Sequence, residues 1–247
     1  MNREYHKWFS PNLGQEIEML VFGHAGVRAV VLPPKCGRFY QYEDHGMVEA
    51  LRDRLESGSI QLFCVDSFDA HALYNRQIPP RERILRQLSF EKYILDEVLP
   101  FSERKSPGTP LLAHGCSLGA SHAVNLAFRH PWRFNGVLAL SGRYDLTCHF
   151  GGFPDLFDGY YDEDIYFNTP SHFIPNLTDH DLLKQMRGLR ITIVIGSTDI
   201  FLENNIALSR ALWNKGIWHA LHVWEGKAHD FCQWREMLKL YALPASA

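Results

Sequence analysis

Short apolar runs alternate with longer amphipathic segments along most of the chain. The short runs are rich in β-branched residues, and several are apolar almost throughout, which is typical of strands covered on both faces by helices. The longer segments repeat their apolar residues about every 3.6 positions, which predicts helices. The predicted strands are Ile17–Phe22, Val27–Leu32, Ile60–Val65, Pro110–Ala113, Gly136–Leu140, Arg190–Ile195 and Ala220–Trp224, and the predicted helices are Met47–Leu55, Arg81–Pro100, Leu118–Arg129, Glu203–Lys215 and Phe231–Tyr241.

This alternation predicts an α/β fold, in which a mostly parallel, twisted sheet has helices on both faces. An eightfold α/β barrel shows the same alternation, so the pattern alone leaves that alternative open. No segment rich in proline, glycine and serine divides the 247 residues. A single domain over residues 1–247 is therefore expected.

One stretch, at about residues 143–182, breaks the alternation. It has no clear period and is rich in aromatic residues, with glycines and prolines close by. A connection of this length inside a compact domain is more often functional than idle, so we expect a lid-like insertion. The alternative is an irregular flap whose aromatic residues only pack on the sheet. These residues include Phe150, Phe153, Phe157, Tyr160, Tyr161, Tyr166, Phe167 and Phe173.

Composition narrows the class of protein. The chain is 46% hydrophobic and 21% charged, which supports a sizeable core, and its net charge is −3 with no lysine or arginine run, which argues against a nucleic-acid binder. No stretch approaches the roughly 18 apolar residues of a membrane span, and the mixed charges of residues 1–8 do not resemble a signal peptide, so a cytoplasmic location is expected. The cysteines are five, widely spaced and without a C-x-x-C pair, which argues against a disulfide framework or a zinc site. They are Cys36, Cys64, Cys116, Cys148 and Cys232.

The motif that carries chemistry is Gly115-Cys116-Ser117-Leu118-Gly119, which fits G-x-S-x-G. It stands between a strand-like run ending at His114 and the predicted helix Leu118–Arg129. A strand, a sharp turn and a helix form a nucleophile elbow, in which the glycines relieve crowding and the serine oxygen is exposed. The alternative is a glycine-rich turn with an inert serine.

A serine hydroxyl needs a base to take its proton and an acid to orient that base. In this type of fold the chain order is serine, acid, histidine, each following a strand. His229 follows the predicted last strand and precedes a helix, as the base should. A surface histidine that caps the helix is the alternative. Four other histidines lie before the elbow or at the last strand itself: His6, His24, His219 and His222.

The orienting acid is expected on the loop after the penultimate strand, Arg190–Ile195. Asp199 lies on that loop and is the preferred candidate. Glu203, one helical turn further, is the reserve, and Asp230 is too close to His229 in sequence to orient its ring. Asp199 could instead be a plain helix cap.

Two backbone N–H groups should stabilise the oxyanion that forms during acyl transfer. One is the N–H of Leu118, at the positive end of the helix behind the serine. The other should come from the loop Leu32–Phe39, whose two prolines have no N–H. Lys35, Cys36 or Gly37 must then supply it, with a slight preference for Cys36, because Gly37 after it can relax the turn.

With these residues in place, the sequence resembles α/β-hydrolases of the esterase family that includes S-formylglutathione hydrolase-type and feruloyl-type esterases, and within it a bacterial branch. The resemblance implies a triad of Ser117, Asp199 and His229, ester hydrolysis through an acyl-enzyme, and no metal. Cys36 is a departure, since serine or glycine is expected there in this branch. The matching stretches are Cys36–Asp44, Gln61–Ser67, His114–Ala123, Leu138–Leu146, Gly159–Pro170 and Ala228–Trp234.

The sequence thus predicts a serine carboxylesterase for small-molecule esters, without a cofactor. Candidate substrate-binding residues are Tyr160, Phe167 and Phe39. A thioesterase or acyltransferase with the same triad, and a non-catalytic binding protein of the same fold, are the alternatives.

Overall fold

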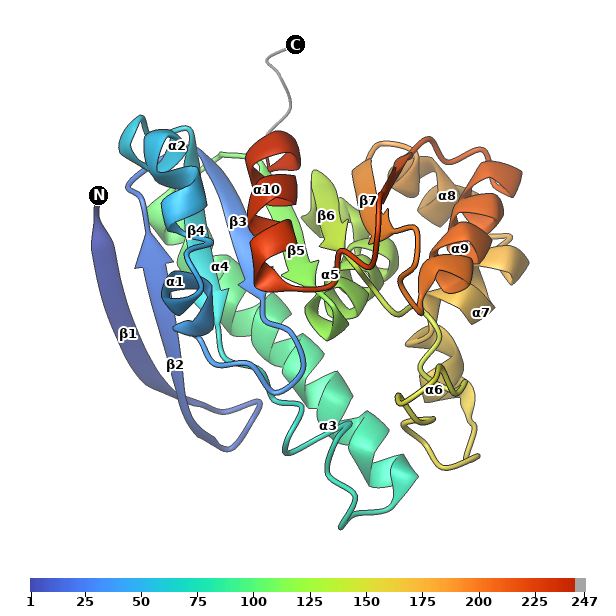
Figure 1. The fold of residues 1–247 in the computed structure, drawn as a ribbon. Coiled ribbons are helices and arrows are strands. Elements are labelled where there is room, and N and C mark those ends of the chain that lie inside the picture. Colours follow the sequence, from blue (N-terminus) through green and yellow to red (C-terminus); the bar gives the residue numbers. More distant parts are fainter. Residues whose placement is uncertain (243–247) are drawn as a thin grey trace.

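One eight-stranded sheet runs through the computed structural model, which describes residues 1–242 (Figure 1). Its strands are β1 (Arg3–Ser10), β2 (Gln15–Phe22), β3 (Val27–Leu32), β4 (Ile60–Val65), β5 (Leu111–Cys116), β6 (Gly136–Leu140), β7 (Arg190–Gly196) and β8 (Ala220–Trp224). They lie in the order β1-β2-β4-β3-β5-β6-β7-β8. β2 is antiparallel to β1 and β4, and all other pairs are parallel. The sheet is open, with β1 and β8 at its edges, which excludes the barrel.

Helices cover both faces of the sheet (Figure 1). Alternate strand residues therefore enter two different cores: Val137 and Ala139 of β6 face one, and Leu138 and Leu140 face the other. This explains why the central strands are apolar almost throughout. The face with Leu138 is covered by α1 (Gln41–Asp44), the 3₁₀ turn η1 (Glu49–Leu51), α2 (Arg52–Glu56) and α10 (Phe231–Tyr241). The opposite face is covered by α3 (Pro80–Tyr93), the π-helical turn η2 (Ile94–Val98), α4 (Leu99–Lys105), α5 (Leu118–Arg129), α7 (Pro170–Asn176), α8 (His180–Met186) and α9 (Leu202–Asn214).

Several elements differ from the prediction. The helix predicted over Met47–Leu55 is replaced by a turn, the 3₁₀ turn η1 and the short helix α2. Strand β1 was not predicted, because it is an edge strand with many charged residues and its side chains are only half-buried or exposed up to Ser10. The helix predicted to end at Pro100 continues to Lys105. Proline lacks an N–H and breaks the regular hydrogen-bond ladder, and here the π-helical turn η2 directly before α4 accommodates Pro100 near the start of a new helical segment.

The stretch at 143–182 contains more regular structure than its sequence suggests. An irregular segment follows β6 and leads into α6 (Glu163–Phe167), α7 and α8. Leu146, Leu156 and Phe157 form a small separate core with Leu73 and with Leu118 of the elbow. The segment is therefore packed directly against the helix that follows Ser117.

Three arginines on the chain before and within α3 bind this insertion. Arg83 donates to the carbonyl oxygen of Leu156 (2.8 Å) and is paired with Asp158 (2.7 Å). Arg76 also pairs with Asp158. Arg81 pairs with two carboxylates of the insertion, those of Asp162 and Asp164. These contacts join the insertion to α3 at several points.

Candidate active site

Ser117 stands at the sharp turn between β5 and α5. Its backbone angles are φ 54° and ψ −120°, a conformation that favours glycine. A Cβ atom at Gly115 would lie 2.2 Å from the backbone of Gly119, and one at Gly119 would lie 2.1 Å from the carbonyl oxygen of Leu32. The two glycines of the motif therefore allow strand, turn and helix to approach closely, as an elbow requires.

The structure brings the three predicted catalytic side chains together. His229 Nε2 lies 3.0 Å from Ser117 Oγ, and His229 Nδ1 lies 2.7 Å from Asp199 Oδ2. Ser117 and His229 are partly exposed, whereas the side chain of Asp199 is fully buried. With Nδ1 donating to the carboxylate, Nε2 has a free lone pair directed at the serine hydroxyl.

The alternative acids lie elsewhere. Glu203 is exposed in the first turn of α9. Asp230 caps α10, where its carboxylate accepts the N–H of Gln233. Asp199 itself also accepts the backbone N–H of Phe201 (3.0 Å). Its carboxylate thus holds the turn before α9 with one oxygen and the imidazole with the other.

The His229 ring is enclosed by two aromatic side chains that the sequence did not single out. The ring centres of Phe201 and Trp234 lie 5.8 Å and 5.4 Å from that of His229. Ser141, directly after β6, accepts a hydrogen bond from Trp234 Nε1 and donates one to the carbonyl oxygen of Ala228 (both 3.0 Å). Ser141 therefore fixes the loop that carries the histidine.

The oxyanion loop, defined here as residues 33–39 after β3, passes beside the elbow. The N–H of Leu118 belongs to the first turn of α5, where backbone N–H groups have no partner within the helix. In the oxyanion loop the Cys36 N–H donates to Asp69 Oδ2 (2.9 Å) and the Gly37 N–H to the carbonyl oxygen of Pro34 (2.8 Å). The Lys35 N–H has no hydrogen-bond partner within residues 1–242, so Lys35 replaces the slightly preferred Cys36 as the candidate loop donor.

Strained backbone is concentrated around this site. Five non-glycine residues within residues 1–242 have a positive φ, and four of them carry or adjoin site groups: Cys36, Ser117, Ser141 and Ala228. Each such backbone conformation costs about 1–3 kcal/mol of folding free energy and persists only where the surrounding structure holds it. The fifth, Asp158, lies in the insertion.

The three candidate substrate-binding residues are placed differently. Phe39 is buried and packs on Tyr5 and Tyr40. Tyr160 and Phe167 are exposed. Tyr160 donates to Asp162 and Phe167 packs on Tyr166, and within residues 1–242 neither makes a hydrogen bond or ring contact with the triad. The insertion instead meets the site through other rings: those of Phe150 and Phe153 pack on Phe201, beside His229.

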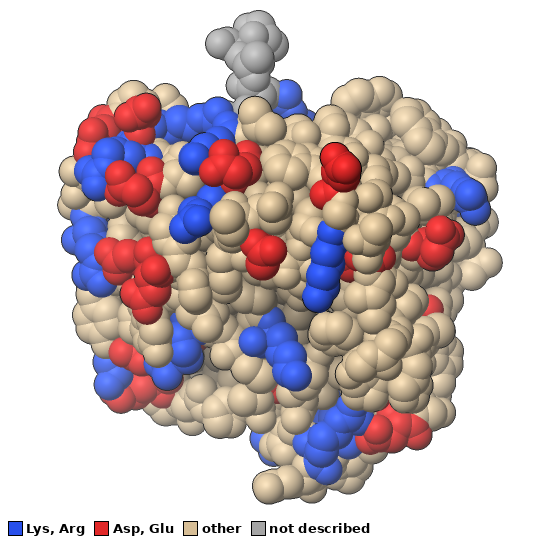
Figure 2. Space-filling model, in the orientation of Figure 1, with Lys and Arg blue, Asp and Glu red and all other residues tan. Residues whose placement is uncertain are grey.

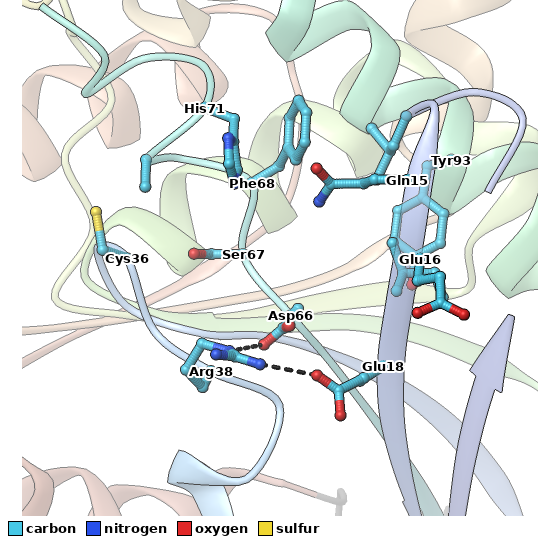
Figure 3. A pocket seen from close by; sticks show the side chains of 13 residues that line it. Gln15, Glu16, Glu18, Cys36, Arg38, Asp66, Ser67, Phe68, His71 and Tyr93 are labelled. Carbon is cyan, nitrogen blue, oxygen red and sulfur yellow. Dashed lines mark hydrogen bonds and ion pairs between the residues drawn. The ribbon is translucent and has the colours of Figure 1, made fainter. Parts of the chain in front are cut away.

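A cavity of about 340 Å³ lies between β2, the oxyanion loop and the segment after β4 (Figure 3). Arg38 crosses it and donates to Asp66 (2.8 Å) and Glu18 (2.9 Å). Glu16 is paired with Lys7 (2.6 Å). The carboxylates lining the cavity are thus neutralised by neighbouring cations.

The thiol beside Ser117 is not a competing nucleophile in this arrangement. Cys116 is buried in the core, and burial raises the pKa of its thiol well above the usual range. A thiol attacks as the thiolate, so a raised pKa suppresses its reactivity. No group of three His, Cys, Asp or Glu side chains within residues 1–242 could hold a metal ion.

Two further observations concern surface charge and membrane-spanning helices. On the face drawn in Figure 2, lysines and arginines are interspersed with acidic residues and form no continuous basic patch. No helix in the described part of the chain is both long and apolar enough to cross a membrane.

Solved structures with the same fold are numerous. A ferulic acid esterase superposes with a TM-score of 0.76 at 18% identity, over 97% of this chain and 96% of that one. FphF, a fluorophosphonate-binding serine hydrolase of Staphylococcus aureus, gives 0.73 at 14% identity, over 97% and 96%. An S-formylglutathione hydrolase from Agrobacterium tumefaciens gives 0.72 at 14% identity, over 96% and 91%. The chain therefore has the α/β-hydrolase fold.

The family follows from the sequence itself. The profile of the esterase family described as "Putative esterase" matches residues 37–240, so the chain belongs to that family and is a carboxylic ester hydrolase. No curated protein matches it by sequence.

Proposed function

We propose that the chain is a serine carboxylesterase that acts through Ser117, His229 and Asp199. Ser117 Oγ attacks the ester carbonyl carbon while His229 Nε2 takes the hydroxyl proton. The tetrahedral intermediate then expels the alcohol, which receives that proton, and an acyl-enzyme remains. Water attacks the acyl group, His229 takes and returns its proton in the same way, and the carboxylic acid leaves.

The backbone supplies the charge stabilisation in this proposal. The negative charge that develops on the carbonyl oxygen would be met by the N–H of Leu118 and by that of Lys35. Such donors act without reorganisation because the elbow and the oxyanion loop are already folded around them. Asp199 keeps Nδ1 of His229 protonated, so that Nε2 is the basic nitrogen.

The observation that carries the proposal is the continuous hydrogen-bond chain from Ser117 Oγ through His229 to the buried Asp199, with steps of 3.0 Å and 2.7 Å. The three residues come from three separate loops, after β5, β7 and β8, and their side chains meet in one line of hydrogen bonds. The substrates of the structural neighbours include a ferulic acid ester and a thioester, S-formylglutathione. Small esters of both kinds are therefore the candidate substrates.

The test combines labelling with turnover. The native chain is expected to react with a fluorophosphonate probe and to hydrolyse nitrophenyl esters from acetate to decanoate, with a thioester tested in parallel. Ser117→Ala should abolish both labelling and turnover, whereas the matched control Cys116→Ala should retain most activity. An active Ser117→Ala enzyme, or a native chain that neither labels nor turns over, would refute the proposal.

A further inference from the structure

A second aspartate–histidine pair, Asp69 and His122, lies beside the oxyanion loop. Asp69 is 1% exposed and His122 is 6% exposed. His122 Nε2 lies 3.1 Å from Asp69 Oδ1, and Asp69 Oδ2 accepts the N–H of Cys36 at 2.9 Å. One buried carboxylate therefore joins the oxyanion loop to α5, the helix that carries His122 and begins directly after Ser117.

The surroundings of His122 exclude it as a base. Gln87 Nε2 lies 3.2 Å from His122 Nδ1. An amide nitrogen is only a donor, so Nδ1 accepts and Nε2 carries the proton that is donated to Asp69. Both ring nitrogens of the neutral imidazole are then occupied. His229 differs, because its Nε2 lone pair faces the Ser117 hydroxyl.

We propose that Asp69 is a positioning residue that aligns the oxyanion loop. Its carboxylate fixes the Cys36 N–H, which belongs to the peptide between Lys35 and Cys36. The preceding peptide then presents the Lys35 N–H to the oxyanion. Cys36 has φ 52°, a strained conformation that needs such an external contact to persist. A hydrogen bond to a charged acceptor is about twice as strong as one to a neutral acceptor. A carboxylate therefore holds this strained part of the loop better than a neutral side chain would. The inference rests on the proposed function of Ser117.

The test uses Asp69→Asn with Asp66→Asn as matched control. Asp66 also accepts a loop N–H, that of Phe39 at 2.7 Å, but on the side away from Lys35. Removing one oxyanion donor costs about 10²–10³ in kcat, so a misaligned donor in Asp69→Asn should cost about tenfold to hundredfold, with KM changed less than about threefold. The affinity for a trifluoromethyl ketone, which forms a tetrahedral adduct, should fall by the same factor as kcat/KM. Asp66→Asn should lose less than about threefold in kcat.

Rates are expressed per active site, counted by titration with a fluorophosphonate, so that unfolded protein does not contribute. A merely structural role of Asp69 would lower the number of active sites and leave kcat per site and inhibitor affinity unchanged, which would overturn the proposal. Equal losses in both variants would also overturn it. A native chain that cannot be titrated refutes the proposed function instead.

An independent observation concerns a small cavity between α3, α5 and the insertion. Three of the residues that line it each have a buried polar atom with no partner within residues 1–242: Gln87 Oε1, Asn125 Oδ1 and Arg143 Nη1. All three residues are at most 6% exposed. The space open to the centre of a water molecule is only about 10 Å³, so the cavity admits water but no larger ligand.

We infer that this cavity binds one structural water. A water molecule donates two hydrogen bonds and accepts others, and the cavity offers two acceptors, on Gln87 and Asn125, and one donor, on Arg143. The rest of the Arg143 guanidinium donates to carbonyl oxygens of the insertion, including that of Cys148 (2.6 Å) and that of Pro154 (2.8 Å). The water therefore links the insertion to α3 and α5.

A high-resolution crystal structure of the native chain tests this site. One electron-density peak is expected at about 2.7–3.2 Å from all three atoms. In Asn125→Leu, whose side chain has a similar size but no acceptor, the peak should be absent. An empty native cavity, a cavity with several waters, or an Arg143 that turns to bond Asn125 directly would overturn the inference.

Discussion

Replacing Asp199 by asparagine tests how the acid orients the base. In the native site one carboxylate oxygen accepts the Phe201 N–H at 3.0 Å and the other accepts His229 Nδ1 at 2.7 Å. Asparagine has one oxygen and one NH₂ group. If its oxygen stays on Phe201, its NH₂ group faces His229 and can pair only with an unprotonated Nδ1. The ring proton then moves to Nε2, which faces Ser117 and can no longer accept the hydroxyl proton.

The expected loss in kcat for Asp199→Asn is about 10⁴, the value that a wrong imidazole tautomer costs in serine hydrolases. Glu203→Gln is the matched control, since Glu203 is exposed on α9, and it should lose less than about tenfold. The assay is kcat on a nitrophenyl ester, with folding of both variants checked by circular dichroism. A folded Asp199→Asn enzyme with near-native kcat, beside an inactive Glu203→Gln enzyme, would refute the assignment.

Three further changes have definite expected results. Gly119→Ala should abolish activity or folding, because its Cβ would lie 2.1 Å from the Leu32 carbonyl oxygen; active, native-like protein would contradict the close packing of the elbow. Burial lowers the pKa of His114 to about 4 from 6.5, so only the unfolded chain binds this proton between those values. Above about pH 6.5 this group leaves the free energy of unfolding unchanged, and towards pH 4 it lowers that free energy by about 3 kcal/mol. Urea unfolding of the native chain and of His114→Gln at several pH values measures this change, and equal pH slopes for the two proteins would contradict it. Tyr160→Ala and Phe167→Ala should alter the ratio of kcat/KM between short and long esters if the insertion shapes the substrate pocket, and equal scaling of all esters would assign these residues a structural role.

The sequence predicts strands well where both faces are buried, because such strands are apolar throughout. β3, β4 and β6 are buried in this way and have the predicted bounds. β8 also has the predicted bounds, although it is an edge strand whose side chains are half-buried or exposed. β1 escapes this signal, since it pairs only at the sheet edge and keeps charged residues along its length. The continuation of the helix beyond Pro100 was not predicted either, because the hydrophobic pattern does not reveal the π-helical turn that accommodates the proline.

The candidate triad is predictable for a related reason. Parallel strands end at one edge of the sheet, so residues on the loops that follow β5, β7 and β8 lie together there. Asp69 and Ser141 follow the parallel strands β4 and β6, so the same argument places them at this edge, but it does not predict what they contact. Each acts through a backbone group that is distant in sequence, Cys36 for Asp69 and Ala228 for Ser141, and no motif links such pairs.

The strained residues of the site are stabilised by the sheet that precedes them. The Ser117 N–H donates to the carbonyl oxygen of Leu140 (2.8 Å), and the Ser141 N–H donates to that of Val194 (2.7 Å). Each strained residue thus extends the hydrogen bonding of its own strand by one step before the chain turns. Because the strain is offset by contacts that form on folding, the nucleophile and the loop of the base are in place before substrate binds, and none of the binding energy is needed to build them.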